Sequence, residues 1–242
     1  MASPAPTTAS PDEIARFQAL ADEWWDAEGK LKPLHQMNPP RLAFMRDKLA
    51  AHFARRGDRP FAGLTLLDVG CGGGLLSEPM ARLGFAVTGI DAAESSIAIA
   101  RRHAEGGELT IDYRCALPEQ IEGEFDVVLA MEVVEHVPSV DVFFSAVAER
   151  LTAGGAFVGA TLNRTAKSYA MAIVGAEYVL GWLPRGTHAW RKFLRPSEFA
   201  ALLRRNGIRP AAFEGVRYAP WRDRWDRCQS LDVNYMVYGV KG

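Results

Sequence analysis

Two glutamates and a histidine follow the apolar run of residues 125–131 closely, as Glu132, Glu135 and His136. Two carboxylates and an imidazole at this spacing can bind one divalent cation. His136 could instead accept a proton from a substrate as a general base. In a purely structural role, all three side chains would hydrogen-bond the backbone and shape the wall of a cleft. The residues alone leave metal binding and the structural role equally open.

A glycine-rich turn is the second chemical feature. The apolar residues 66–69 include Asp68 and lead into Gly70, Gly72 and Gly74, and a helical pattern follows over residues 75–83. This order predicts a buried strand, a tight turn and a helix whose free amide groups can face a nucleotide-like cofactor. The dinucleotide fingerprint Gly-x-Gly-x-x-Gly fails here because Leu75 occupies its third glycine position, which disfavours a nicotinamide enzyme.

Asp91 ends the next apolar run, residues 85–90, about 20 residues after the glycine turn. A carboxylate at the tip of this second strand can accept hydrogen bonds from both hydroxyls of a ribose. The turn and the correctly spaced Asp91 together resemble the S-adenosylmethionine-dependent methyltransferases with a Rossmann-like fold.

Apolar runs alternate with helical patterns along the rest of the chain. The spacing predicts an α/β, doubly wound and mostly parallel seven-stranded sheet whose final strand is antiparallel. Helices are expected at 93–104, 139–151 and 196–206. Strands are expected at residues 66–69, 85–90, 109–114, 125–131, 156–161, 208–216 and 232–240.

The region before the first strand predicts a helical extension. Residues 1–10 are small, polar and proline-rich, which indicates a disordered tail, and residues 11–60 carry the helical patterns of a domain that runs to residue 242. Trp24 and Trp25 are most simply packing residues, although a substrate lid is an alternative. Pro39-Pro40 can open a helix, which would place Arg41 in its first turn.

Composition excludes several classes of protein. A formal net charge of −1 gives no general attraction to nucleic acid, so we expect no nucleic-acid partner. Three cysteines without metal-like spacing favour a reducing compartment over a disulfide framework. The amino-terminal residues have no signal-peptide pattern, and we therefore expect a cytoplasmic protein.

Residues 163–192 interrupt the alternation of strands and helices. Between residues 168 and 184 this insert is apolar and aromatic with Glu177 as its single charge, while Arg164 and Lys167 precede it and Arg185, Arg191 and Lys192 follow. The apolar run is too short and too interrupted to cross a bilayer. The pattern favours peripheral docking on an anionic membrane at its inner face. A lid over the active site is the alternative.

Several further motifs make the chain, from about residue 11 to 238, similar to the ubiquinone-biosynthesis O-methyltransferase family. They are Trp24-Trp25-Asp26, Lys32-Pro33-Leu34-His35, Asn38-Pro39-x-Arg41-Leu42, residues 67–74, Met131-Glu132-x-x-Glu135-His136-Val137-Pro138, Thr161-Leu162-Asn163-Arg164, Val174-Gly175-Ala176-Glu177-Tyr178, Gly186-Thr187-His188 and Asp232-Val233-Asn234-Tyr235.

The resemblance implies both a cofactor and a substrate. It implies methylation of phenolic or catechol hydroxyls of polyprenylated precursors (2-polyprenyl-6-hydroxyphenol and 3-demethylubiquinol) and contact with other ubiquinone-biosynthesis proteins. It assigns a divalent cation, magnesium, to Glu132, Glu135 and His136. It assigns S-adenosylmethionine to Arg41, Gly70, Gly72, Asp91 and Met131, with Arg41 clamping the methionine carboxylate.

Some alternatives remain open at this point. His136 is either a metal ligand or the catalytic base, and His188 is a second candidate base. An O-methyltransferase acting on a soluble phenol would share the same fold, but would have no need for the apolar insert. A non-catalytic membrane or assembly protein could also keep this fold, although the intact cofactor motif speaks against that.

Overall fold

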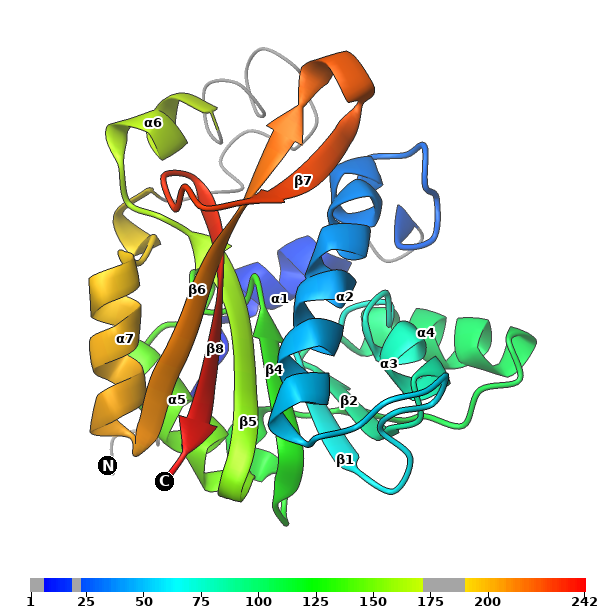
Figure 1. The fold of residues 1–242 in the computed structure, drawn as a ribbon. Coiled ribbons are helices and arrows are strands. Elements are labelled where there is room, and N and C mark those ends of the chain that lie inside the picture. Colours follow the sequence, from blue (N-terminus) through cyan, green and yellow to red (C-terminus); the bar gives the residue numbers. More distant parts are fainter. Residues whose placement is uncertain (1–6, 19–22, 172–189) are drawn as a thin grey trace, which may run out of the picture.

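The computed structural model describes residues 7–18, 23–171 and 190–242 of the chain. Within them, eight strands form one sheet in the order β3-β2-β1-β4-β5-β8-β6-β7 (Figure 1). The strands are β1 (Thr65–Val69), β2 (Ala86–Asp91), β3 (Asp112–Cys115), β4 (Phe125–Met131), β5 (Leu151–Leu162), β6 (Ile208–Ala219), β7 (Arg224–Cys228) and β8 (Asn234–Lys241).

The sheet is parallel from β3 to β5 and antiparallel at its other end. Strand β8 pairs antiparallel with both β5 and β6, and β7 pairs antiparallel with β6. The predicted doubly wound, mostly parallel fold is confirmed. Among the described residues, the sheet has one strand more than the predicted seven. The additional strand is β7, which pairs with β6 and which the sequence did not predict because Arg-Trp-Asp-Arg-Cys resembles a charged loop.

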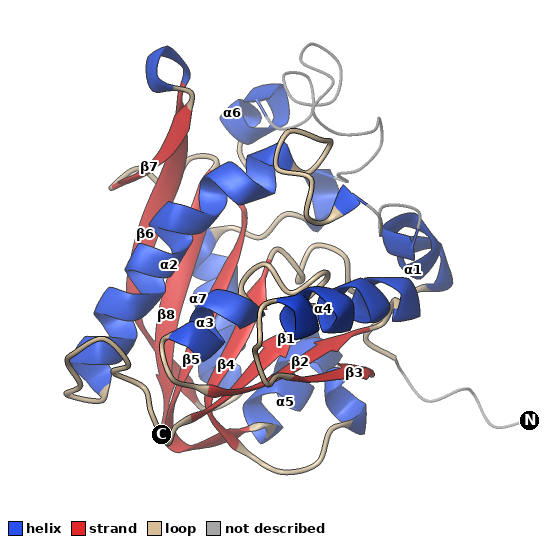
Figure 2. Ribbon diagram, turned by 90° about the vertical axis from the view of Figure 1, so that its right-hand side faces the viewer, coloured by secondary structure: helices blue, strands red, loops and turns tan. Residues whose placement is uncertain are grey.

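Helices cover both faces of the sheet. Figure 2 shows α2, α3 and α4 in front of the strands and α5 and α7 behind them. Phe144 of α5 and Phe199 of α7 pack with Phe157 in one core, whereas Phe44 of α2 and Met80 of α3 belong to the core on the other face. The helices are α1 (Pro11–Gln18), α2 (Lys32–His52), α3 (Ser77–Arg82), α4 (Glu94–Gly106), α5 (Val140–Glu149), α6 (Ala166–Ser168) and α7 (Pro196–Arg205).

Helix α2 begins seven residues earlier than predicted, at Lys32 rather than at Pro39. Pro33 lies in its first turn, where a missing N–H group is tolerated. Pro39 and Pro40 lie inside the helix and cannot donate to the preceding turn, yet packing of the helix on the sheet maintains it. Arg41 therefore lies in the middle of α2 rather than in a first turn.

The tail expected over residues 1–10 extends too far along the chain, because Thr8 already packs against the domain. Thr8 is buried, and the carboxylate of Glu119 accepts hydrogen bonds from its backbone N–H (3.0 Å) and its hydroxyl (2.6 Å). Sequence patterns miss this contact because Glu119 lies 111 residues away. Residues 1–6 lie outside the described residues.

The described ends of the insert lie beside each other. The Trp190 Nε1–H donates to the carbonyl oxygen of Thr165 (2.9 Å), and the Tyr169 and Trp190 rings meet edge to face. No helix of the described residues is long and apolar enough to span a membrane. The motifs at residues 174–178 and 186–188, and with them His188, lie outside the described part of the chain.

Candidate active site

A cavity of about 960 Å³ opens at the carboxyl ends of β1, β2 and β4. Strand β1 lies between β2 and β4, so the strand order reverses there, and ligands of doubly wound sheets bind at such a position. Of the predicted cofactor residues, Arg41, Gly70, Asp91 and Met131 line this cavity and Gly72 does not; Glu132, Glu135 and His136 line it as well.

The glycine turn after β1 is held by the end of β2. The backbone N–H groups of Gly70 and Cys71 both donate to the carbonyl oxygen of Ile90, at 2.8 and 2.9 Å. Gly72 has a φ of +53°, and a Cβ atom added there would lie 2.2 Å from the Trp24 ring. Glycine is required at this position both by the backbone conformation and by the ring packed on it.

The tryptophan pair attaches the amino-terminal extension to this turn. The Trp24 Nε1–H donates to the Ser96 hydroxyl (3.2 Å), and the Trp25 Nε1–H donates to the carbonyl oxygen of Gly73 (2.9 Å). The Trp25 ring stacks on His103 with a centroid distance of 3.4 Å. Both side chains therefore pack the extension onto the cofactor turn, in agreement with the simpler of the two predicted roles.

Asp91 lines the cavity and also braces the turn. Its Oδ2 accepts from the backbone N–H of Gly72 (3.0 Å) and its Oδ1 from that of Ala93 (2.8 Å). Burial raises the pKa of the Asp91 carboxyl. Each carboxylate oxygen has further lone pairs, so these two bonds leave capacity for ribose hydroxyls.

Asp68 is a buried acid beside the turn that sequence reasoning did not single out as a site residue. The Ser77 hydroxyl donates to its Oδ2 (2.6 Å), and burial raises the pKa of the Asp68 carboxyl to about 7. The folded protein therefore retains a proton that the unfolded chain releases near its ordinary pKa of 3.8. Stability contributed by this proton is lost as pH rises from about 4 to about 7.

Asp68→Asn should stabilise the cofactor-free protein increasingly as pH rises, because asparagine cannot ionise. Relative to wild type, the gain in free energy of unfolding should grow by about 2 to 3 kcal/mol between about pH 5 and pH 8. Urea unfolding at the two pH values measures it, with Asp58→Asn at an exposed carboxylate as the control. A gain that is the same at both pH values would contradict the buried-acid assignment.

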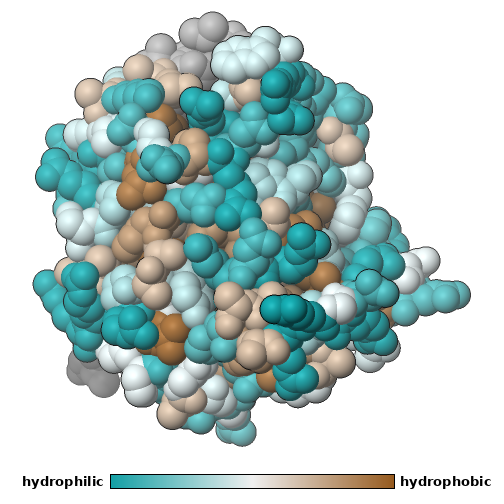
Figure 3. All heavy atoms as spheres, in the orientation of Figure 1, coloured by the Kyte–Doolittle hydropathy of each residue, from teal (hydrophilic) through white to brown (hydrophobic). Residues whose placement is uncertain are grey.

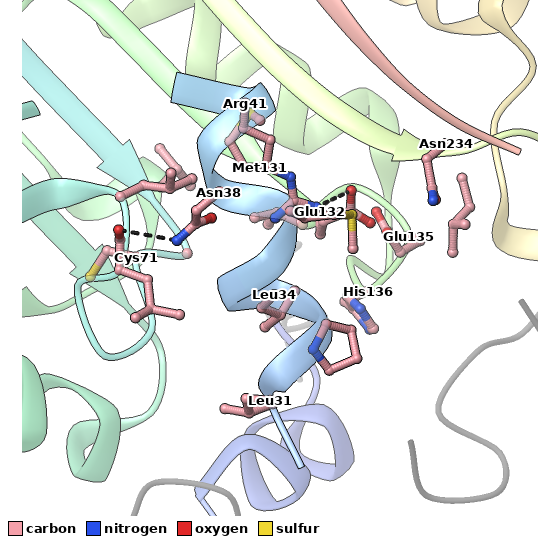
Figure 4. Close-up of a pocket in the computed structure, with 18 of the residues that line it drawn as sticks. Leu31, Leu34, Asn38, Arg41, Cys71, Met131, Glu132, Glu135, His136 and Asn234 are labelled. Atoms are coloured by element: carbon pink, nitrogen blue, oxygen red, sulfur yellow. Dashed lines mark hydrogen bonds and ion pairs between the residues drawn. The ribbon is translucent and has the colours of Figure 1, made fainter. Parts of the chain in front are cut away.

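Arg41 and Glu132 form an ion pair across the cavity wall. Arg41 Nη2 lies 2.7 Å from Glu132 Oε1, and the two side chains are 4% and 20% exposed (Figure 4). Glu132 has a φ of +58°, a left-handed conformation that is uncommon for a residue with a side chain. The pair joins residues 91 positions apart, and no local pattern predicts it.

Glu135 is buried next to Glu132. Its Oε2 accepts a hydrogen bond from the Thr161 hydroxyl (2.9 Å), whereas its Oε1 has no hydrogen-bond partner in the described structure. Burial, and then the neighbouring Glu132 carboxylate, raise the pKa of Glu135 well above its ordinary value. A buried oxygen without a partner, beside a second carboxylate, fits a cation that the two acids would share.

His136 lies farther along the same loop, away from the two carboxylates (Figure 4). Its Nδ1 lies 3.2 Å from Oε2 of Glu13, a residue of α1 that sequence reasoning missed. Among the described residues, no three His, Cys, Asp or Glu side chains are grouped to hold a metal ion. The structure thus brings Glu132 and Glu135 together and places the predicted third ligand beside Glu13.

Comparisons with known proteins identify the family of the chain. A family profile described as "Methyltransferase domain" matches residues 41–211. A Paramagnetospirillum magneticum protein named "Ubiquinone biosynthesis O-methyltransferase" is 62% identical over 97% of this chain and 96% of its own length. A Chelativorans protein of the same name is 52% identical over 97% of this chain and 95% of its own length.

The chain belongs to this family. The predicted enzyme class, an S-adenosylmethionine-dependent O-methyltransferase of ubiquinone biosynthesis, is therefore confirmed. The fold also resembles that of magnesium protoporphyrin IX methyltransferase from Synechocystis with bound SAM. That match has a TM-score of 0.62 and 17% identity, and it covers 98% of this chain and all of the other.

Proposed function

We propose that this O-methyltransferase transfers the methyl group of S-adenosylmethionine to a phenolic hydroxyl of a polyprenylated catechol or quinol. The observation that carries the proposal is one cavity that joins Asp91 and the glycine turn to the Glu132–Glu135 pair. A cofactor bound at the turn and a phenol near the acids would meet inside that cavity.

Asp91 would bind the ribose hydroxyls, while Gly70, Gly72 and Met131 would contact the rest of the cofactor. Arg41 bonds Glu132 through one of its nitrogens. A guanidinium has five N–H donors, so the remaining ones could bind the methionine carboxylate of the cofactor. In this arrangement Arg41 would link the cofactor to the acidic pair.

The acidic pair would hold the divalent cation, with magnesium the expected ion because carboxylate oxygens suit it. A bound cation acts as a Lewis acid that lowers the pKa of a coordinated phenol. The orphaned Oε1 of Glu135 supports this assignment. The position of His136 beside Glu13 favours a role in accepting the phenolic proton over one as a third ligand.

Methyl transfer itself requires mainly alignment. The carbon–sulfur bond of the sulfonium breaks as the oxygen–carbon bond forms on its opposite side, and the phenolic proton leaves to a base. Holding oxygen, carbon and sulfur in line is the contribution expected of the cavity walls. His136, at the wall of the cavity, is the candidate base.

Glu13 should matter for turnover because it contacts the imidazole of His136. Glu13→Ala is expected to lower kcat by about 10- to 100-fold, with little change in the KM for S-adenosylmethionine, since it removes the partner that orients the ring. Glu13→Gln, which retains an acceptor oxygen, should lose less. Asp12→Ala in the same turn is the control for α1, and equal effects at both positions would contradict the role of Glu13.

We also propose that the enzyme is peripherally bound to the inner face of an anionic membrane through the insert at residues 163–192, which could alternatively act only as a lid. Two of its flanking cations have partners in the protein, since Arg164 pairs with Glu198 and Lys167 with Asp232. Exposed Tyr169 and Met171 support the proposal more directly. Contact with other ubiquinone-biosynthesis proteins is a further expectation.

A turnover assay tests the proposed reaction. Labelled S-adenosylmethionine should methylate a catechol carrying a short prenyl tail, and the same catechol without a tail should be a poorer substrate. Equal rates on both would favour a soluble substrate. Cofactor binding without turnover on either would favour the non-catalytic alternative.

A further inference from the structure

The turn between β6 and β7 exposes a tryptophan. Trp221, in the short 3-10 turn Pro220–Arg222, is 78% exposed, compared with 50% for Tyr169 and 49% for Met171. These three are the exposed large hydrophobic residues of the described part of the chain. Single exposed hydrophobic residues are common on protein surfaces, so the surroundings of Trp221 decide whether it can bind a partner.

The turn is braced from both sides. The Tyr218 hydroxyl donates to the Asp223 carboxylate, and the Tyr218 and Trp225 rings pack at a centroid distance of 5.6 Å. The side-chain amide of Gln36 in α2 donates to the carbonyl oxygen of Asp223 (3.2 Å). Trp221 is therefore presented to solvent by a turn that other elements fix in place.

Basic residues surround this tryptophan. Arg217 and Arg222 are exposed and form no ion pair with any described residue, whereas Arg224 pairs with Asp226 (2.9 Å). An exposed aromatic ring flanked by unpaired arginines is the combination that suits a membrane interface with anionic headgroups.

The turn lies at the same end of the molecule as α6. Figures 1 and 2, viewed at right angles, both place the β6–β7 turn and α6 at the top. On the broad face seen in Figure 3, hydrophilic residues dominate and the hydrophobic ones lie in small separate patches. The exposed large hydrophobic residues of the described part of the chain, Tyr169, Met171 and Trp221, follow α6 or lie in the β6–β7 turn and are therefore found at this end.

The cavity reaches this end as well. Its lining includes Lys167 and Met171 on the α6 side, and Tyr218, Pro220 and Trp225 on the β6–β7 side. Residues of both elements therefore border the same cavity as the cofactor turn, so a hydrophobic tail bound along them would lead toward that turn.

We propose that Trp221, Arg217 and Arg222 form a membrane-binding surface for a bilayer with anionic headgroups, beside Tyr169 and Met171 of the insert. This Trp221 surface is a second contact, made by an element outside the insert. It rests on the proposed function in one respect, because the polyprenyl tail of the substrate would enter beside it.

Co-sedimentation with vesicles tests the surface. Wild type should bind phosphatidylcholine vesicles weakly, bind vesicles containing phosphatidylglycerol more strongly, and lose that binding with added salt. Trp221→Ser should reduce binding about tenfold, and each of Arg217→Ser and Arg222→Ser about fivefold on anionic vesicles only. Arg55→Ser, at an exposed arginine in the loop that follows α2 at the opposite end, is the charge-matched control and should bind like wild type.

Turnover of a water-soluble catechol separates this proposal from the proposed function. Trp221→Ser should retain that turnover while losing vesicle binding. Wild-type binding by both the Trp221 and the arginine variants would overturn the surface, as would failure of wild type to bind anionic vesicles. If wild type binds vesicles through Trp221 but shows no turnover, the proposed reaction is refuted. The proposed membrane-binding surface is not affected by that result. If Trp221→Ser does not fold, the arginine variants decide.

Discussion

Removal of divalent cations is expected to abolish methyl transfer and to leave S-adenosylmethionine binding nearly unchanged. The physical reason is the pKa of the substrate, since a phenol titrates near 10 and little phenolate exists at neutral pH without a Lewis acid. Exhaustive dialysis against chelator followed by the labelled-methyl assay measures turnover, and calorimetry measures cofactor affinity. Added magnesium should restore the rate.

Glu135→Gln supplies a readout that does not depend on activity. The substitution keeps an oxygen that can accept from Thr161 but removes the carboxylate that could bind the cation. It should therefore weaken Mn²⁺ binding, followed by electron paramagnetic resonance, by about 10- to 100-fold. Full activity in demetallated wild type would show that turnover needs no cation and that Glu132, Glu135 and His136 have a structural role.

Asp91→Ala should weaken S-adenosylmethionine binding by about 10- to 100-fold, or about 1.5 to 3 kcal/mol. Two effects act in the same direction, because the variant loses the acceptor for the ribose and the acceptor that positions the Gly72 amide. Calorimetric titration of the folded variant measures the loss.

A second, more conservative variant should show a smaller loss. Asp91→Asn keeps an oxygen able to accept from the Ala93 amide and should fall between wild type and Asp91→Ala. An unchanged affinity in a folded Asp91→Ala variant would mean that the cofactor lies elsewhere.

Local spacing was sufficient to predict that the glycine turn and Asp91 lie together at the edge of the sheet. The glycine turn and Asp91 each follow an apolar run, and carboxyl ends of adjacent parallel strands must meet at one edge of a sheet. The same reasoning placed Glu132 after β4. It mislocated the start of α2, because proline carries a strong local signal that packing overrides.

The long-range contacts of the site residues could not be predicted from local spacing. Arg41 reaches Glu132 across 91 positions and Glu13 reaches His136 across 123, with no periodicity to connect them. Similarly, the charged sequence of β7 does not predict a strand, and β7 forms one by pairing with the edge strand β6. These features depend on the assembled sheet, and the sequence shows them only as isolated charges.

The tryptophan pair also has a consequence for the order of folding. Trp24 leaves the ribosome early, yet it packs on Gly72 and bonds Ser96, which follow 48 and 72 residues later. The amino-terminal extension can therefore complete its packing only after β1, β2 and the turn between them have formed. Hydrogen-exchange protection at Trp24 and Trp25 should consequently appear late during synthesis or refolding, after that of β1, even though these residues are made first.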